Sequence, residues 1–248
     1  MPELTPVAWA VLALGAFGVG FSKTAIGGLA SVCVALYAAV LPAKASTGTL
    51  LVLLLVGDVV AVSVYRHDVA WRALGRLVAP VLAGVGVGAV FLARVSDSTL
   101  KTTIGIVLLA LVALHYARGV GSGRRGESGR RGRSGRRGGL ALALGYGSLA
   151  GFTTMVANAG GAAMTLYFLN ARFGMMRFLG TGAWFFFLVN TLKLPFSVGL
   201  GLIDSGSLAT CAPLVPLVLA GAWAGRIVIK RTNQARFNTL VLAFTAVS

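Results

Sequence analysis

Charged residues are scarce in this chain of 248 amino acids, at 11% of the sequence against 57% hydrophobic residues. A soluble domain of this length could not bury so much apolar surface, which disfavours a soluble helical bundle and indicates a protein that sits in a lipid bilayer. Several apolar runs approach the ~20 residues that cross a bilayer, and they lie near 44–65, 74–93, 102–117, 178–200 and 208–229. Because lipid offers no partner for open backbone groups, we expect these runs to be transmembrane helices.

Cysteine and histidine are rarer still, with two of each. Cys33 and Cys211 both lie in apolar sequence, which argues against a disulfide framework and favours two buried small side chains. The sequence has no Cys/His spacing typical of a metal site, no phosphate-binding glycine loop and no recognisable Ser/His/Asp set. We therefore expect neither an enzyme nor a protein that holds a metal or another cofactor.

One sequence pattern occurs twice along the chain. The corresponding segments are GFSKT at 20–24 and GFTTM at 151–155, Thr-Gly at 47–48 and 181–182, and glycine pairs at 84 and 88 and at 221 and 225. The offset between the two copies drifts only from 131 to 137 residues, which small insertions explain and chance matching does not. We interpret GFSKT and GFTTM as breaks inside membrane helices, the first followed by Ile26-Gly27-Gly28 and the second extending to Asn158 and Gly160-Gly161. The later glycine pairs are interpreted as sites of close helix packing.

A dense run of positive charge separates the two copies. Residues 118–139 read RGVGSGRRGESGRRGRSGRRGG, a composition typical of a disordered linker, and the positive-inside rule places this linker in the cytoplasm. The chain then divides into a first transmembrane repeat at 1–117, the linker, and a second transmembrane repeat at 140–248. We expect the linker to contact anionic lipid headgroups. Nucleic acid is not expected as a partner, because no aromatic residue is interleaved to stack on bases.

A cytoplasmic linker sets the direction of every other helix. It places the loop with Arg66 and Arg72 in the cytoplasm and the turn at Asp97 outside, and the basic residues of the second copy place its equivalent turn inside. The two repeats are therefore predicted to be inverted, each with a broken or re-entrant helical hairpin followed by three transmembrane helices. The hairpins at 5–41 and 140–171 have arms of roughly 16 residues, or ~24 Å of helix, so they either turn back inside the membrane or cross it at a stretch.

Polar residues at membrane depth are costly, so those in this chain point to function. A short helix is expected to begin in mid-membrane at each hairpin break, with unpaired N–H groups and a partial positive charge at its start. Such a site suits an anion, and Lys23 would supply the formal countercharge. The predicted substrate-binding residues at the interface of the two repeats are Ser22, Lys23, Thr24, Thr153, Thr154, Asn158, Asn190 and Lys193.

Several of these residues also have ordinary structural interpretations. Lys23 could extend toward the membrane surface or form a structural ion pair, and the asparagines could form hydrogen bonds between helices. Asp58 is expected either to neutralise a lysine or to carry a proton. Trp184 and the phenylalanines at 185–187 are expected to form a cavity wall or to pack against lipid. Pro195 is expected to break its helix and to free a carbonyl group.

Four strings resemble the TauE/SafE family of membrane permeases, whose members are described as sulfite or organosulfonate exporters. The strings are GFSKTAIGGL, PAKASTGTLLVLLLVGD, AGFTTMVANAGG and GTGAWFFFLVNTLKLPF. The resemblance covers the chain apart from the basic linker, and it implies a helical, multi-pass transporter of the bacterial cytoplasmic membrane. The motif residues that it implicates are Ser22, Lys23, Thr24, Thr153, Thr154, Asn158, Thr181, Trp184, Asn190 and Lys193.

The residues and the resemblance predict the same function. A small sulfur oxyanion, either sulfite or an organosulfonate, is expected to bind between the hairpins while the two repeats alternate access around it. Proton coupling through Asp58 stays open, and a passive anion channel of the same architecture is the alternative. Exposed faces of small residues permit a homodimer without requiring one.

Overall fold

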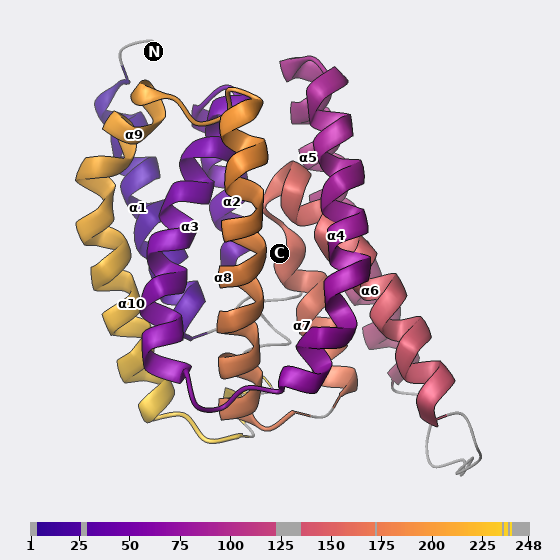
Figure 1. Ribbon diagram of the computed structural model, residues 1–248. Coiled ribbons are helices and arrows are strands. Elements are labelled where there is room, and N and C mark those ends of the chain that lie inside the picture. Colours follow the sequence, from indigo (N-terminus) through magenta and orange to yellow (C-terminus); the bar gives the residue numbers. More distant parts are fainter. Residues whose placement is uncertain are drawn as a thin grey trace.

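The computed structural model describes residues 4–25, 29–122, 135–171, 173–234, 236–237 and 239, and nearly all of them are helical (Figure 1). The predicted first repeat contains α1 (Pro6–Thr24), α2 (Leu29–Val40), α3 (Ala43–Tyr65), α4 (Trp71–Arg94) and α5 (Asp97–Ser122). The second contains α6 (Gly135–Ala157), α7 (Gly160–Asn170), α8 (Met175–Gly199), α9 (Ser205–Cys211), the 3-10 turn η1 (Ala212–Leu214) and α10 (Val215–Lys230). No strand occurs within these described ranges.

The helices follow the apolar runs of the sequence closely. The run predicted at 44–65 is α3, and the run at 208–229 is the stretch from α9 to α10. Helices that are long and apolar enough to cross a membrane span Pro6–Thr24, Ala43–Tyr65, Trp71–Arg94 and Ser205–Lys230. The prediction of an all-helical membrane protein is therefore confirmed.

Both hairpins turn later in the chain than the sequence suggested. Residues 20–24 form the last turn of α1, which ends at the C-cap Ala25, and residues 151–155 lie inside α6. The second hairpin turns at Asn158, whose φ of 51° lies in the left-handed region that asparagine tolerates better than most residues. The prediction that residues 20–24 and 151–155 are themselves broken was therefore wrong, whereas Asn158, which the second predicted break included, is where that hairpin turns.

The glycines of the repeated pattern bring helices of the two repeats into backbone contact. Helix α1 packs along α10, and α4 packs along α6. A Cβ atom on Gly20 would lie only 1.9 Å from the carbonyl oxygen of Val218, and one on Gly84 would lie 2.2 Å from that of Ser148. Backbone oxygen atoms crowd Gly151 and Gly221 in the same way, whereas the nearest atoms at Gly88 and Gly225 belong to the side chains of Met155 and Thr24. The close packing expected at the later glycine pairs is confirmed.

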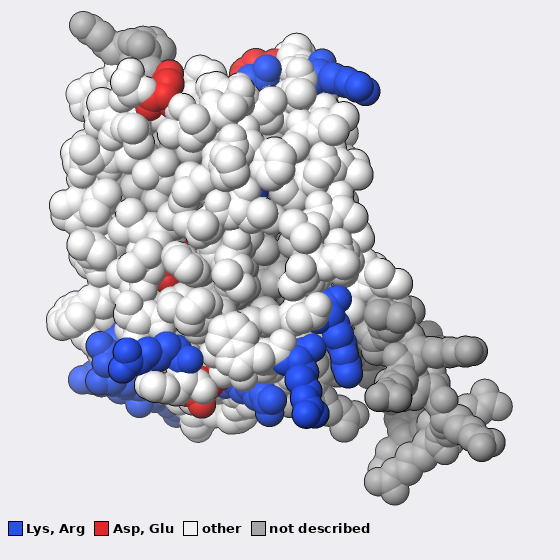
Figure 2. Space-filling model, viewed as in Figure 1, with Lys and Arg blue, Asp and Glu red and all other residues white. Residues whose placement is uncertain are grey.

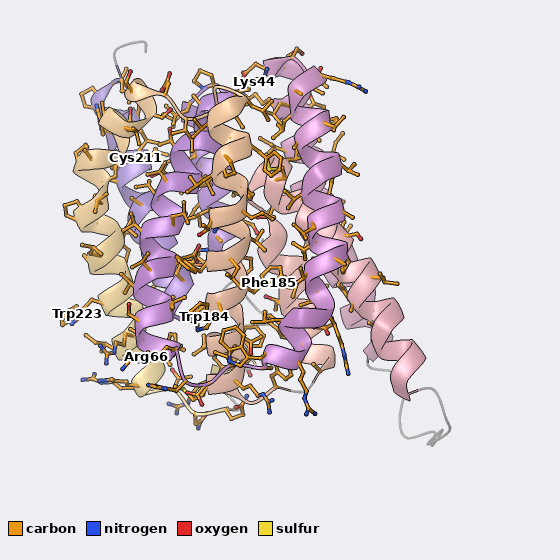
Figure 3. All side chains as sticks on the ribbon, viewed as in Figure 1. Lys44, Arg66, Trp184, Phe185, Cys211 and Trp223 are labelled. Atoms are coloured by element: carbon orange, nitrogen blue, oxygen red, sulfur yellow. The ribbon has the colours of Figure 1, made fainter. Side chains whose placement is uncertain are left out.

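The two hairpins enter the bundle from opposite ends. In Figure 1 the α1–α2 hairpin begins and ends at the end where α9 lies, whereas the α6–α7 hairpin begins and ends at the other. Figure 2 shows that most lysines and arginines visible on this face gather at the second end, which we call the basic end. It carries the α3–α4 connection with Arg66, while Lys44 lies at the opposite end (Figure 3).

The predicted linker at 118–139 is only partly described. Helix α5 continues to Ser122 and α6 begins at Gly135, so the two ends of this segment are helical. The intervening residues 123–134 lie outside the described ranges, and the expectation of disorder there stays a prediction.

Candidate functional site

A cavity of about 50 Å³ lies among the two hairpins and helix α8. One water molecule needs roughly 10–15 Å³ by the same measure, so the cavity has room for a small ligand. Its polar lining consists of Ser22 and Lys23 from α1, Thr154 and Asn158 from the second hairpin, Thr165 from α7 and Asn190 from α8. Its larger apolar lining residues are Leu54, Phe168, Phe178, Leu179 and Phe186.

The lining residues of α8 show which way the cavity extends. Leu179, Gly182, Ala183, Phe186 and Asn190 follow helical spacing, so they share one face of the helix. Helix α8 begins at the basic end, so this face leads from the polar groups near Asn190 toward that end (Figure 1). The cavity is therefore polar at its inner part and mostly apolar toward the basic end.

Lys23 forms a buried ion pair with Asp58 beside the cavity. Its Nζ lies 2.6 Å from Asp58 Oδ1, and Asn190 Nδ2 donates to Asp58 Oδ2 at 2.6 Å. Asp58 is completely buried, whereas Lys23 lines the cavity with its Nζ 4.7 Å from the ring centroid of Phe186. Gly57 leaves room for the lysine stem, since a Cβ atom there would lie 2.9 Å from Lys23 Cγ. Lys23 also belongs to the last turn of α1, where the partial negative charge of the helix end favours a cation.

Lys193 is fully buried and contacts the second hairpin. Its Nζ donates to the carbonyl oxygen of Thr154 and to Asn158 Oδ1, both at 2.5 Å, and lies 3.4 Å from Thr154 Oγ1. Asn158 in turn donates through Nδ2 to the carbonyl oxygen of Thr47 at 3.0 Å. These acceptors of Lys193 are formally neutral, so among the described residues it has no carboxylate partner of the kind that Lys23 has.

Each hairpin also brings the start of its second helix to the cavity. Ala30 is the second residue of α2, Gly161 is the second residue of α7, and both line the cavity. N–H groups in the first turn of a helix have no intrahelical acceptor, and they carry a partial positive charge. The cavity wall therefore joins two electropositive helix starts to the ammonium group of Lys23.

The structure divides the predicted binding residues into three groups. Ser22, Lys23, Thr154, Asn158 and Asn190 line the cavity, and Asp58 and Lys193 lie directly behind them. The hydroxyl groups of Thr24 and Thr153 are engaged elsewhere, donating to the carbonyl oxygens of Ala222 and Leu149, both at 2.7 Å. The sequence thus identified polar groups of the site without showing which helix face each one occupies.

Two further motif residues serve the packing of the first half of α8. Thr181 Oγ1 accepts a hydrogen bond from the backbone N–H of Ala70 at 2.9 Å, and the Trp184 ring centroid lies 5.2 Å from that of Trp71. Figure 3 shows Trp184 toward the basic end of the helix. Phe186, two residues further along, lines the cavity, whereas Trp184 does not.

Several residues of the cavity wall were not predicted from the sequence, and one nearby prediction was wrong. Thr165 follows Gly161 by four positions, so helical spacing could have placed both on one face of α7. Phe168 and Phe178 carry no such signal, because an apolar residue of a membrane helix looks the same whether it faces lipid or a cavity. Pro195 does not break its helix as predicted, since α8 continues beyond it.

These features define an integral membrane protein of helices around a buried cavity with an ammonium group in its wall. The model of the sulfite exporter TauE/SafE family matches residues 12–248, and the chain therefore belongs to this family. Searches of curated proteins and of solved structures return no significant match. The resemblance noted in the sequence is confirmed, and the protein is a membrane transporter of the sulfite-exporter type.

Proposed function

We propose that the protein is a secondary transporter that exports a small sulfur oxyanion, sulfite or an organosulfonate, across the bacterial cytoplasmic membrane. The observation that carries this proposal is the position of Lys23, which lies in the wall of a cavity that the starts of α2 and α7 also line. Hydroxyl and amide groups of Ser22, Thr154, Asn158 and Asn190 line the same space. Positive charge, helix starts and polar side chains together form an environment suited to anion binding.

The charged groups lie deep in the bundle. Asp58 is seven residues from the end of α3 and Lys193 is six residues from the end of α8, so each is about 9 Å or more of helix from the nearer end. Ionisable groups at such depth in membrane helices commonly mark a substrate pathway. Their depth supports a binding site that is reached in turn from the two sides of the membrane.

Alternating access is supported by the relation between the two halves. The hairpins enter from opposite ends, and glycine contacts join each hairpin to a long helix of the other half. These features are typical of inverted repeats, in which one half rocks against the other around a fixed site. The positive-inside rule puts the basic end in the cytoplasm, so the cavity would extend toward the cytoplasmic side.

Asp58 acts in this proposal as a countercharge. One of its carboxylate oxygens is paired with Lys23, and the other accepts from Asn190. A carboxylate that carries protons between two sides needs access to water, whereas Asp58 is completely buried. Proton coupling is therefore tested as a separate variable in the transport experiment.

Uptake of radiolabelled sulfite into proteoliposomes, with and without an imposed pH gradient, tests the proposal. We expect saturable uptake that is lost in the Lys23→Ala/Asp58→Asn double variant, in which neither charge of the pair remains. Lys101→Ala is the matched control, because Lys101 is exposed near the start of α5 and its loss should leave uptake unchanged. Linear uptake without saturation would favour a passive channel, and the absence of uptake by folded protein would contradict sulfite transport.

A further inference from the structure

The formal charges of the side chains around the cavity do not sum to zero. Lys23 lies in the wall, Asp58 and Lys193 lie directly behind it, and the first two form an ion pair. One positive charge, on Lys193, is left without a negative partner. We infer that the charge of the site matches a monoanion, a sulfonate or hydrogen sulfite, and that the site selects against dianions such as sulfate. This inference rests on the proposed function.

The contacts of Lys193 fit its charged form. An ammonium group has three donors and no acceptor. Three oxygen atoms lie around Nζ, and two of them, the carbonyl oxygen of Thr154 and Asn158 Oδ1, can only accept. The Asn158 amide is held in this orientation, because its Nδ2 donates to the carbonyl oxygen of Thr47. All three oxygen atoms can accept, so the surroundings of Nζ accommodate the three donors of an ammonium group.

Among the described helices that line the cavity, no second acidic residue balances this charge. Asp58 is the only acidic residue in the helices that line the cavity, which are α1, α2, α3, α6, α7 and α8. Their charged residues besides Asp58 and the two lysines are Lys44, Arg136, Arg137 and Arg177, each within the first three positions of its helix. The helix ends add no net charge to this count, because the positive starts of α2 and α7 are matched by the negative ends of α1 and α6. The two starts still offer N–H donors to an anion.

A monoanion would neutralise the core, whereas a dianion would leave it with a net negative charge. Uncompensated charge at membrane depth is costly, so this difference favours the monoanion. For sulfite, a polar group of the cavity wall also favours the monoanion. Asn190 Oδ1 is buried and has no hydrogen-bond partner among the described residues. Its Nδ2 is committed to Asp58, so the free atom is an acceptor. Hydrogen sulfite carries a proton that this acceptor can bind, and the sulfite dianion does not.

Methanesulfonate and sulfate provide a direct test, because they have similar shapes and differ by one unit of charge. We expect the purified protein to bind methanesulfonate more tightly than sulfate in isothermal titration calorimetry at one pH and ionic strength. Asp58→Asn makes the core more positive by one unit, so it should shift the affinity ratio toward sulfate by about tenfold or more. The shift between proteins is the decisive quantity, because the different hydration costs of the two anions cancel in it.

Further variants complete this charge series. Lys193→Met should shift the ratio toward methanesulfonate, and Asp58→Asn/Lys193→Met should restore the wild-type ratio. Lys101→Met removes an exposed lysine and should leave the ratio unchanged. A ratio that neither Asp58→Asn nor Lys193→Met moves, or a wild-type preference for sulfate, overturns the charge match and leaves the transporter proposal standing. If the folded wild-type protein binds neither anion, the anion site itself fails, and both proposals fail with it.

Discussion

The two halves of the cavity have similar scaffolds and opposite chemistry. In the first half the hairpin supplies the cation, Lys23, and the long helix α3 supplies the acceptor, Asp58. In the second half the long helix α8 supplies the cation, Lys193, and the hairpin supplies the acceptors, Thr154 and Asn158. The repeat offset of 131 residues pairs Lys23 with Thr154, and the offset of 134 residues places Lys193 one position from Asp58. Donor and acceptor have therefore exchanged places between the halves.

The exchange also changes how each cation is balanced. Lys23 has a carboxylate partner inside the protein, whereas Lys193 is surrounded by neutral oxygen atoms. A paired buried lysine is costly to remove, because its loss leaves the partner charge buried and uncompensated. An unpaired one leaves the core short of a negative charge, which a bound anion can supply. The first half thus balances its cation within the protein, whereas the second half leaves a positive charge beside the cavity that a bound anion can balance.

The largest difference between the two halves should be seen in the stability of variants that lack one lysine each. Lys23→Met leaves Asp58 buried without a cation, and the loss of one partner of a buried pair costs about 3–5 kcal/mol in the free energy of unfolding. Lys193→Met removes an unbalanced charge and leaves Asn158 Oδ1 without this donor, whereas the carbonyl oxygen of Thr154 still accepts from the Asn158 backbone N–H at 3.0 Å. It should therefore cost no more than about 1–3 kcal/mol. Denaturant unfolding of the purified variants in one detergent measures the difference.

The control is the double variant Lys23→Met/Asp58→Asn, which removes both charges of the pair. It should recover most of the stability that Lys23→Met loses. Equal losses for the two lysine variants, or no recovery in the double variant, would show that the ion pair does not stabilise the first half in this way.

A smaller difference in stability should distinguish glycines that contact a neighbouring helix from glycines that have open space around them. Gly84→Ala puts a Cβ atom 2.2 Å from the carbonyl oxygen of Ser148, so it should push α4 away from α6 at a cost of about 1–3 kcal/mol. Gly86→Ala meets nothing within 4 Å and should be neutral or stabilising by up to about 1 kcal/mol through its helix propensity. Gly221→Ala, at the corresponding contact of the other half, should resemble Gly84→Ala. Thermal unfolding of the three variants would reveal unequal packing if Gly84 and Gly221 gave clearly different losses.

The helices were predictable because a bilayer imposes one length and one composition on them. The run predicted at 44–65 differs from α3 by one residue at its start, and the hairpin at 5–41 contains α1 and α2. The position of each hairpin turn was predictable only to within a few residues. Glycine in an apolar helix is compatible with a break and with close packing, and only the neighbouring helix decides between them. Gly20 and Gly151 belong to the second kind.

The site was predictable in content but not in arrangement. Lys23, Asp58 and Asn190 could be found because polar groups at membrane depth are rare and costly. Thr24 and Thr153 could not be separated from the lining residues, because a helix that is apolar all round has no polar face to fix its rotation. Both hydroxyl groups donate to backbone carbonyl oxygens, a use open to any threonine in a membrane helix.

The smallest expected difference between the two halves lies in the connections that follow α3 and α8. In the first half the backbone N–H of Ala70 donates to Thr181 Oγ1, a neutral acceptor. In the second half Asp204 caps α9, and its Oδ1 accepts from the Ser207 N–H at 2.6 Å and from the Ser207 hydroxyl at 2.8 Å. The backbone hydrogen bond from Ser207, followed by the hydroxyl bond, lowers the pKa of Asp204 below its ordinary value.

A carboxyl group whose pKa is lowered by folding stabilises the protein above its unfolded pKa of ~3.9, and this contribution is lost as the pH falls through the lower, folded value. Asp204→Ala should therefore lower Tm by a small, constant amount between about pH 5 and pH 8, and by progressively less below about pH 4. Thr181→Val removes the neutral acceptor of the first half, so its effect should not follow this titration. Thermal unfolding of both variants and the wild type across this range provides the comparison. An Asp204→Ala effect that stayed constant into strong acid would contradict a charged cap, and would leave the two connections alike.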